Sequence, residues 1–397
     1  MQSETNIDQG NLKNQIWVVG GYGQVGQMIC TQLAGVFPGK VWAAGTRLER
    51  AEQFSHQTGG AVKPMQLDIM ERVDPAMLQN VKLVIMCVDQ NDTRFVESCT
   101  KAGADYIDIS AKAGFLKQVE RLDSVIKSSG STAILSVGLS PGVTNLLVRE
   151  AATQLDQVDE ADITVMLGLG EKHGKAAVEW TVDQMNANYE VMQQGKVVEV
   201  QSLSGGKSID FGEGLGRHMA YRFPFSDQQA VARTLRIPNV STRLCLDSRW
   251  ITRALSISRR AGLLKLLRFA WAREMAVKAL ALIPGGKPMF AVKVDVSGWG
   301  NEERIDMQQL VIGEKEAVTT AEVAAAVAKK LYVNPREPGV YHVEQCFSLQ
   351  DIQEELVHPL NVVTKIINRT DGRCDVLRSS YEQFKALDAT LLRYFCP

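Results

Sequence analysis

An apolar run that ends at a cluster of glycines constrains the N-terminal part of the chain most strongly. Residues 16–19 read Ile-Trp-Val-Val, glycines follow at 21, 23 and 26, and a helix-like run covers residues 27–34. In a strand–turn–helix unit these glycines permit a tight turn, close approach of a pyrophosphate and close helix–strand packing. The pattern therefore predicts a dinucleotide site rather than an ordinary glycine-rich turn. The residues predicted to line this site are Gly21, Tyr22, Gly23, Gln24, Val25 and Gly26.

The first third of the chain alternates between strand-like and helix-like runs. Apolar strands separated by helices indicate βαβ units and a parallel sheet that is covered on both faces. We therefore predict an α/β fold with an N-terminal Rossmann domain over residues 1–145. The strand-like runs are 16–19, 41–44, 62–67, 83–88, 106–109 and 132–137.

The end of the second strand bears on the choice of cofactor. Ala44-Gly45-Thr46-Arg47 lacks the acidic residue that holds the ribose 2′-hydroxyl in NAD-specific units. A carboxylate repels a 2′-phosphate, whereas a guanidinium pairs with it. Thr46 and Arg47 therefore favour NADP(H) over NAD(H), with Arg50 as a second candidate. Alternatively, Arg47 is a solvated residue in the first turn of the next helix.

Further candidates follow the later strands of the predicted sheet, at the edge where such sheets bind ligands. Asp68 either reaches the adenine or caps the following turn, and Val88 is expected to line the nicotinamide ribose. Asp108 and Ser110 leave the fifth strand.

The segment Val137-Gly-Leu-Ser-Pro-Gly-Val-Thr-Asn145 predicts a second helix N-terminus at the same edge. Ser140 would be the N-cap and Pro141 a first-turn residue of a helix over 143–155. With Gly142, these residues are predicted to bind a substrate carboxylate, and an ordinary capped helix is the alternative.

Composition narrows the class of protein. The chain has 397 residues, 45% of them hydrophobic and 22% charged, and a formal net charge of −1. These values indicate a soluble globular protein and give no reason to expect nucleic acid. The seven cysteines show no metal-binding spacing, so we expect free thiols and no metal. The N-terminus shows no signal-peptide pattern, so we expect a cytoplasmic location.

Several of these motifs occur together in one known family. In order along the chain, these motifs are Val-Val-Gly-Gly-Tyr-Gly-Gln-Val-Gly, Ala-Gly-Thr-Arg, Tyr-Ile-Asp-Ile-Ser and Gly-Leu-Ser-Pro-Gly-Val. With them the chain resembles the saccharopine dehydrogenase (saccharopine reductase-like) family over about residues 16–155, and loosely to about residue 357. The resemblance implies a Rossmann domain, an α/β substrate domain that often dimerises, and NAD(P)H-dependent reduction of an imine formed from an amine and a carbonyl. Many members have Gly-Glu where this chain has Ala111-Lys112.

The middle of the chain differs in character from the first third. Strand-like runs that neighbour one another in sequence indicate a mixed or antiparallel sheet with helices on one face. We predict an α+β substrate and dimerisation domain over 146–335 that forms a homodimer, and a segment over 336–397 that can pack back on the Rossmann domain. Within the middle region, strands over 292–297 and 304–313 are expected to flank a turn at Gly298-Trp-Gly-Asn301.

A basic helical stretch lies between Arg249 and Lys287. It contains nine basic residues and one acid, Glu274. Leu264, Leu267, Trp271 and Met275 fall on one helical face. We favour a dimer element or a lid over a helix that lies on an anionic membrane. A core helix with a solvated basic face is the third interpretation.

Candidates for catalysis come from titratable residues near the predicted cleft. Imine formation and reduction need a group that transfers protons near neutral pH. We predict Asp108, Lys112 and His173 for this role, and Arg222 as a ligand of a substrate carboxylate. His173 can equally be an exposed loop residue. A reductase of C=C or C=O bonds and a cofactor-binding protein without turnover are the alternative functions.

Overall fold

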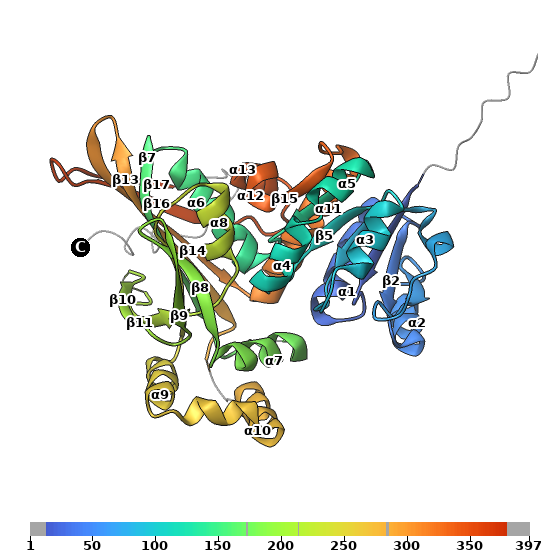
Figure 1. Cartoon of the computed structure of the whole chain (residues 1–397), viewed down its shortest axis with the longest axis horizontal. Helices are drawn as coiled ribbons and strands as arrows, with labels where there is room; N and C mark the ends of the chain where they lie inside the picture. The colour runs from blue at the N-terminus through green and yellow to red at the C-terminus, as the bar shows by residue number, and fades with distance from the viewer. Residues whose placement is uncertain (1–12, 172–173, 213, 283–285, 379–397) are drawn as a thin grey trace, which may run out of the picture. The chain divides into compact units, whose positions relative to one another are not determined.

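A computed structural model describes residues 13–171, 174–212, 214–282 and 286–378. They form two compact units, each with its own sheet (Figure 1). The chain passes between the units several times. The first unit holds the described residues up to Ile109 together with Phe115–Leu135 and Val327–Tyr341, and the second holds Ser110–Gly114, Ser136–Ala326 and the described residues from His342 onward.

The first unit is built on a seven-stranded sheet. Its strand order is β15-β6-β5-β4-β1-β2-β3, and the neighbours from β6 to β3 pair in parallel. The order reverses between β1 and β4, which is the topology of a doubly wound dinucleotide-binding sheet. The predicted Rossmann fold is therefore confirmed. The strands are β1 Gln15–Val19, β2 Val41–Gly45, β3 Lys63–Gln66, β4 Val81–Met86, β5 Asp105–Asp108, β6 Thr132–Leu135 and β15 Gly339–His342.

Short helices connect these strands. The apolar runs are buried almost without interruption, as in Ile16–Val19, because helices cover both faces of a parallel sheet. The helices are α1 Gln24–Val36, α2 Leu48–Gln57, η1 Pro75–Leu78, α3 Arg94–Lys101, α4 Ala113–Glu120 and α5 Asp123–Ser128.

The second unit is built on an eight-stranded sheet with the order β10-β11-β12-β7-β13-β14-β16-β17. β12 and β7 are parallel, and the other neighbours are antiparallel, so the predicted mixed sheet is confirmed. β8 and β9 form a separate pair. The strands are β7 Gln157–Leu167, β8 Asn188–Gln193, β9 Lys196–Gln201, β10 Lys207–Asp210, β11 Arg217–Arg222, β12 Val240–Leu246, β13 Met289–Gly300, β14 Glu303–Glu314, β16 Val362–Asn368 and β17 Cys374–Arg378.

The segment η2 Leu139–Val143 precedes the first helix of the second unit, and a hydrogen bond from the Val143 amide to the Gly138 carbonyl closes it. The long helix α11 carries the chain from the second unit into the first. The remaining helices are α6 Thr144–Ala152, α7 Lys175–Gln184, α8 Asp227–Thr234, α9 Arg249–Arg260, η3 Leu263–Arg268, α10 Ala270–Ala281, α11 Glu316–Val333, α12 Val343–Cys346 and α13 Leu349–Gln353.

The predicted strand pair is confirmed, but its turn is shorter than the predicted Gly298-Trp-Gly-Asn301. β13 and β14 pair without a break as far as Gly300 and Glu303, and the turn consists of Asn301 and Glu302, whose φ angles are 51° and 63°. Two positive φ angles are typical of the two-residue turns that match strand twist. Gly298 lies inside β13, where a Cβ would approach the carbonyl oxygen of Gln157 to 2.0 Å. Close packing on β7, rather than a turn, therefore requires this glycine.

The boundaries of the compact units differ from the predicted domains 1–145, 146–335 and 336–397. The chain leaves the first unit after Leu135, because the loop before α6 packs with the second unit, and it returns to the first unit at Val327–Tyr341. The C-terminal segment contributes to both units. β15 extends the first sheet beside β6, whereas β16 and β17 extend the second sheet beyond β14.

Candidate cofactor and substrate sites

The glycine-rich loop between β1 and α1 shows why its glycines are spaced as they are. A Cβ at Gly21 would lie 2.7 Å from the Cα of Ala43, and a Cβ at Gly26 would lie 2.2 Å from the carbonyl oxygen of Gly20. A Cβ at Gly23 would meet only that same oxygen, at 3.1 Å. Packing within the protein therefore requires glycine at the first and third positions. The second position faces open space, as expected where a ligand approaches the backbone.

The N-terminus of α1 suits a pyrophosphate. Its N-cap, Gly23, makes no side-chain capping hydrogen bond, and the first turn contains no acidic residue. The positive end of the helix dipole is therefore not neutralised by the helix's own side chains. Val88 lies beside the loop, because a Cβ at Gly20 would come within 2.7 Å of its Cγ1. This exposed apolar side chain follows β4, at the point where the strand order reverses.

Tyr22 holds the neighbouring loop after β2 in place. Its ring packs on Gly45, where a Cβ would lie 2.6 Å from the phenol oxygen, and that oxygen accepts a hydrogen bond of 3.0 Å from the Arg47 amide. Thr46 and Arg47 are exposed. Arg47 is the N-cap of α2 rather than a residue of its first turn. Its guanidinium forms no ion pair with any residue in the described part of the chain, which leaves it available to an anion.

Asp68 makes the capping contacts that were one of its two predicted roles. Its Oδ1 accepts a hydrogen bond of 2.9 Å from the Met70 amide, and its carbonyl accepts one from the Glu71 amide. This carboxylate therefore orders the turn after β3, and its predicted contact with a cofactor stays a prediction.

Asp108 lies in a buried polar cluster at the end of β5. The Tyr106 hydroxyl donates to its Oδ2 at 2.5 Å, and the Gln90 amide donates to the Tyr106 hydroxyl at 2.6 Å. Burial, followed by the neighbouring Asp108 carboxylate, raises the pKa of Tyr106 well above its ordinary value. Tyr106 therefore stays protonated and donates. Asp108 is fully buried, so this cluster gives it a clear role in ordering the strand end, while its catalytic role stays a prediction.

The other predicted catalytic residues belong to the second unit or to undescribed parts of the chain. Ser110 is buried and accepts a hydrogen bond of 3.2 Å from the Lys112 amide, which orders the segment after β5. His173 lies outside the described residues. The neighbouring Glu171 accepts hydrogen bonds from the Glu316 and Ala317 amides at 2.7 and 3.1 Å, so it caps α11.

The predicted helix start at Ser140 and Pro141 is wrong. Ser140 is extended, the peptide bond between Ser140 and Pro141 is cis, and Gly142 has a φ of 138°. α6 begins only at Thr144. Because Ser140 and Pro141 have non-helical angles, Ser140 does not cap the helix and its hydroxyl bonds elsewhere.

The partner of Ser140 is Asp227, a fully buried residue that is absent from the sequence-based predictions. Its Oδ2 accepts hydrogen bonds from the hydroxyls of Ser140 and Thr144 at 2.8 and 2.9 Å, and its Oδ1 accepts from the Thr242 hydroxyl and the Gln228 amide at 2.6 and 2.7 Å. Asp227 therefore ties the loop before α6 to β12 and α8. No local pattern marks this residue, because all but one of its partners are distant in sequence.

Two arginines face each other on neighbouring strands of the second unit. Arg222 of β11 pairs directly with Arg243 of β12 in the antiparallel register. Arg243 is neutralised, because its Nη1 donates to Asp162 at 2.7 Å. Arg222 forms no ion pair among the described residues, and its buried Nη1 has no hydrogen-bond partner there. Burial, and then the charge of Arg243, lowers the pKa of Arg222.

Like charges directly opposite one another on paired strands are destabilising, and of these two arginines only Arg243 has a carboxylate partner among the described residues. The half-buried Arg222 is therefore the residue of the second unit best suited to bind a carboxylate. The planar guanidinium of Arg222 presents N–H donors in a geometry that matches the two oxygens of a carboxylate.

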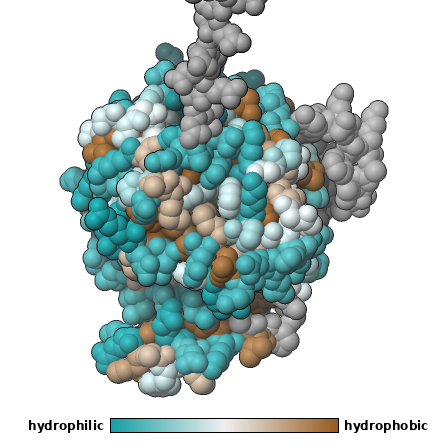
Figure 2. All heavy atoms as spheres, turned by 90° about the vertical axis from the view of Figure 1, so that its right-hand side faces the viewer, coloured by the Kyte–Doolittle hydropathy of each residue, from teal (hydrophilic) through white to brown (hydrophobic). Residues whose placement is uncertain are grey.

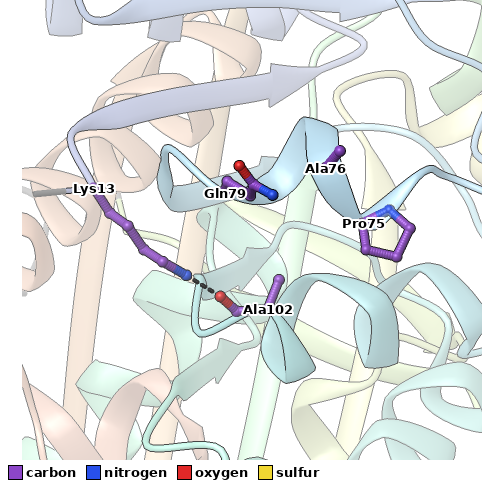
Figure 3. A pocket seen from close by; sticks show the side chains of 5 residues that line it. All are labelled: Lys13, Pro75, Ala76, Gln79 and Ala102. Carbon is purple, nitrogen blue, oxygen red and sulfur yellow. Dashed lines mark hydrogen bonds between the residues drawn. The ribbon is translucent and has the colours of Figure 1, made fainter. Parts of the chain in front are cut away.

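A separate pocket of about 490 Å³ lies elsewhere in the first unit (Figure 3). It is lined by Lys13, Pro75, Ala76, Gln79 and Ala102. Lys13 precedes β1 and donates to the Ala102 carbonyl, so the pocket lies at the sheet edge where β1 begins. Ligands of doubly wound sheets bind at the opposite edge. This pocket is therefore distinct from the dinucleotide site.

Comparison with known proteins agrees with these features. The family model described as the saccharopine dehydrogenase NADP binding domain matches residues 16–166. Residues 16–166 are therefore similar to a saccharopine dehydrogenase NADP-binding domain. The resemblance predicted from the motifs is thereby confirmed, and the chain is an NADP-binding oxidoreductase of saccharopine dehydrogenase-like fold.

Solved structures show how far the fold is shared. The apo saccharopine dehydrogenase (L-Glu forming) from Saccharomyces cerevisiae is similar with a TM-score of 0.63 and 14% identity, over 89% of this chain and 100% of that one. The C. glutamicum DAP dehydrogenase in complex with DAP has a TM-score of 0.41 and 12% identity, over 84% and 94%. At this identity, the first similarity shows a common fold. No curated protein matches the chain significantly.

The residues of this chain fit NADP(H), as predicted. The open space at Gly23 and the uncapped start of α1 fit the pyrophosphate, and Arg47, which has no ion-pair partner among the described residues, fits a 2′-phosphate. β2 ends without an acidic residue that would repel that phosphate. The same sequence features and the family model therefore agree on the cofactor.

Replacing Arg47 tests this fit. If its guanidinium pairs with the 2′-phosphate, we expect Arg47→Ala to weaken NADPH binding by roughly 1.5–3 kcal/mol, about 10- to 100-fold, and to leave NADH binding nearly unchanged. Titration of both cofactors by fluorescence measures the two affinities. Arg72→Ala, which removes another exposed arginine after β3, is the matched control. Equal weakening of both cofactors would show that Arg47 shapes the loop and binds no phosphate.

Proposed function

We propose that the protein uses NADPH to reduce an imine formed between an amino acid and a carbonyl compound, or catalyses the reverse oxidation of a secondary amine. The observation that carries this proposal is Arg222, a half-buried arginine without an ion-pair partner in the described chain. Such a group indicates a substrate that bears a carboxylate. The fold shared with a saccharopine dehydrogenase supports chemistry on a C–N bond.

Each part of the protein has a role in this proposal. The glycine loop and Arg47 hold the cofactor, which supplies a hydride when it is bound. Arg222 binds and orients a substrate carboxylate, and Asp162 does not compete for it because that carboxylate is already paired with Arg243. Orientation of the two reactants provides much of the rate enhancement in such a reaction. Lys112 and His173 are the candidates for proton transfer to the imine nitrogen.

Product analysis tests the proposed reaction. The protein is incubated with NADPH and pairs of amino acids with oxo acids or aldehydes, and products are identified by mass spectrometry. We expect a secondary amine in an amount equal to the NADPH consumed. Consumption of NADPH with a carbonyl compound alone would indicate a C=O reductase instead, and consumption of NADPH with an unsaturated compound would indicate a C=C reductase. Binding of NADPH without consumption in any mixture would indicate a protein without turnover.

Substitution of Arg222 tests the carboxylate site. We expect Arg222→Ala to raise KM for the carboxylate-bearing substrate about 10- to 100-fold, because a charge-assisted, two-pronged contact is lost. Arg222→Lys should recover only part of this loss, since lysine lacks the planar fork. Arg217→Ala is the matched control, because Arg217 lies on the same strand but is exposed and pairs with Asp210. An unchanged KM in Arg222→Ala would remove the carboxylate from the proposal.

A further inference from the structure

The basic segment, residues 249–282, exposes an unusual number of apolar side chains. It comprises α9, η3 and α10, at the bottom of Figure 1. Eight of the 19 large apolar side chains exposed in the described chain lie within it. The most exposed are Trp250 at 81%, Leu282 at 76%, Met275 at 66% and Trp271 at 64%. A solvated face of an ordinary core helix does not carry such residues.

Cationic side chains alternate with these apolar ones. Trp250, Arg253, Ile257 and Arg260 follow one another at spacings of three and four, so they share the outer face of α9. Arg253 and Arg260 form no ion pair with a described residue. The single acid of the stretch, Glu274, is paired with Lys278 at 2.7 Å. Figure 2 shows hydrophobic and hydrophilic residues intermixed on the projecting surface at the bottom of the view.

The segment is attached to the second unit through other side chains. The Thr252 hydroxyl accepts a hydrogen bond of 2.9 Å from the Leu246 amide, and Arg259 donates to Gln201 at 2.6 Å. Arg273 pairs with Asp183 of α7 at 2.6 Å. These contacts hold the segment on the unit while its tryptophans remain exposed. The exposure is therefore not the result of an unattached helix.

We propose that the basic segment binds the surface of an anionic lipid membrane. Phosphate-bearing headgroups supply the negative charge that Arg253 and Arg260 do not find among the described residues, and tryptophan side chains favour the interface between headgroups and acyl chains. No helix in the described part of the chain is long and apolar enough to cross a membrane. The segment therefore lies on the surface.

Charge decides between this surface and a second copy of the chain. In a two-fold symmetric dimer the same patch meets itself. The stretch from Arg249 to Lys287 has nine basic residues and one acid, so two copies would bring like charges together and bury unpaired cations. An anionic lipid surface removes this repulsion. For this segment we therefore favour a lipid surface over the dimer element that was predicted from the sequence.

Vesicle co-sedimentation tests the proposal with the full chain. We expect binding to vesicles of phosphatidylcholine mixed with phosphatidylglycerol, little binding to phosphatidylcholine alone, and weaker binding as salt is added. The triple variant Arg253→Glu, Arg260→Glu, Lys265→Glu should lower the partition coefficient by at least about 100-fold, since each basic residue contributes about 1 kcal/mol near such a surface. The matched control reverses three exposed basic residues elsewhere, Lys117, Lys196 and Arg217.

Tryptophan substitutions separate lipid insertion from charge attraction. Trp250→Ala should lower the partition coefficient about 10-fold and reduce the blue shift of tryptophan emission on vesicles. Trp299→Ala, which removes an exposed tryptophan from the β13–β14 hairpin, should change neither quantity. Absence of binding to the anionic vesicles, or equal loss in the control triple variant, would overturn the proposal. So would a dimer in light scattering that dissociates in the triple variant while no vesicle binding occurs.

Discussion

Gly23→Val is expected to abolish NADPH binding, with a loss on the order of 1,000-fold, about 4 kcal/mol. The valine side chain would occupy the space over the loop where a pyrophosphate approaches the start of α1. The protein itself tolerates a side chain here, because the backbone angles of Gly23, φ −77° and ψ 171°, are ordinary for any residue. Within the chain the new Cβ meets only the Gly20 oxygen, at 3.1 Å, so a shift of a few tenths of an ångström relieves it.

Two further glycine variants make this result interpretable. Gly35→Val adds the same side chain farther along α1, where a Cβ meets nothing within 4 Å, and it should bind NADPH like the wild type. Gly26→Val should instead prevent folding, because its Cβ would lie 2.2 Å from a backbone oxygen. Fluorescence titration gives the affinity and thermal unfolding shows whether each variant is folded. A folded Gly23→Val with wild-type affinity would contradict the site.

Asp227→Ala is expected to lower the free energy of unfolding by about 3–5 kcal/mol. The substitution removes a fully buried carboxylate that accepts four hydrogen bonds, and it leaves the hydroxyls of Ser140, Thr144 and Thr242 without that acceptor. The loop before α6 would also lose its tie to β12. Denaturant unfolding measures the effect, and Asp210→Ala is the control because its pair with Arg217 is exposed and contributes at most about 1 kcal/mol.

Asp227→Asn adds a test that depends on pH. Burial is the largest effect on this carboxyl and raises its pKa above the ordinary value, although four donors oppose the rise. The folded state therefore holds the proton more tightly than the unfolded state, and the stability contributed by this group declines as pH rises through that range. We expect Asp227→Asn to keep the shape, to cost less than Asp227→Ala and to remove this decline. A pH dependence identical to that of the wild type would contradict the assignment.

The dinucleotide site could be predicted because its signals are local. The apolar run, the glycine spacing and the following helix lie within residues 15–36, and the spacing already implies close packing at Gly21 and Gly26 and open space at Gly23. The residues after β2 are also close in sequence to this loop, and because they include no acid they indicated NADP(H) as the cofactor. Alternation of strands and helices in turn predicted the parallel sheet, because crossover connections are right-handed and short.

Other features depended on contacts between residues far apart in sequence. Gly298 looked like a turn residue, but the neighbouring strand β7 decides that it lies inside β13. Ser140 looked like a helix cap, but its hydroxyl bonds to Asp227, 87 positions away. In both cases a local propensity was overridden by a distant partner that the sequence does not identify.

The candidate substrate site and the basic segment likewise combine local features with features that depend on distant contacts. The sequence by itself determined the Rossmann fold, the cofactor and the composition of the segment, because these follow from spacing, charge and periodicity along the chain. Only the tertiary structure decided that Arg222 faces Arg243, that Arg243 is neutralised by Asp162, and that Trp250 and Trp271 are exposed. Strand register and burial arise from long-range packing, and a one-residue change in register would move Arg222 to the opposite face of the sheet.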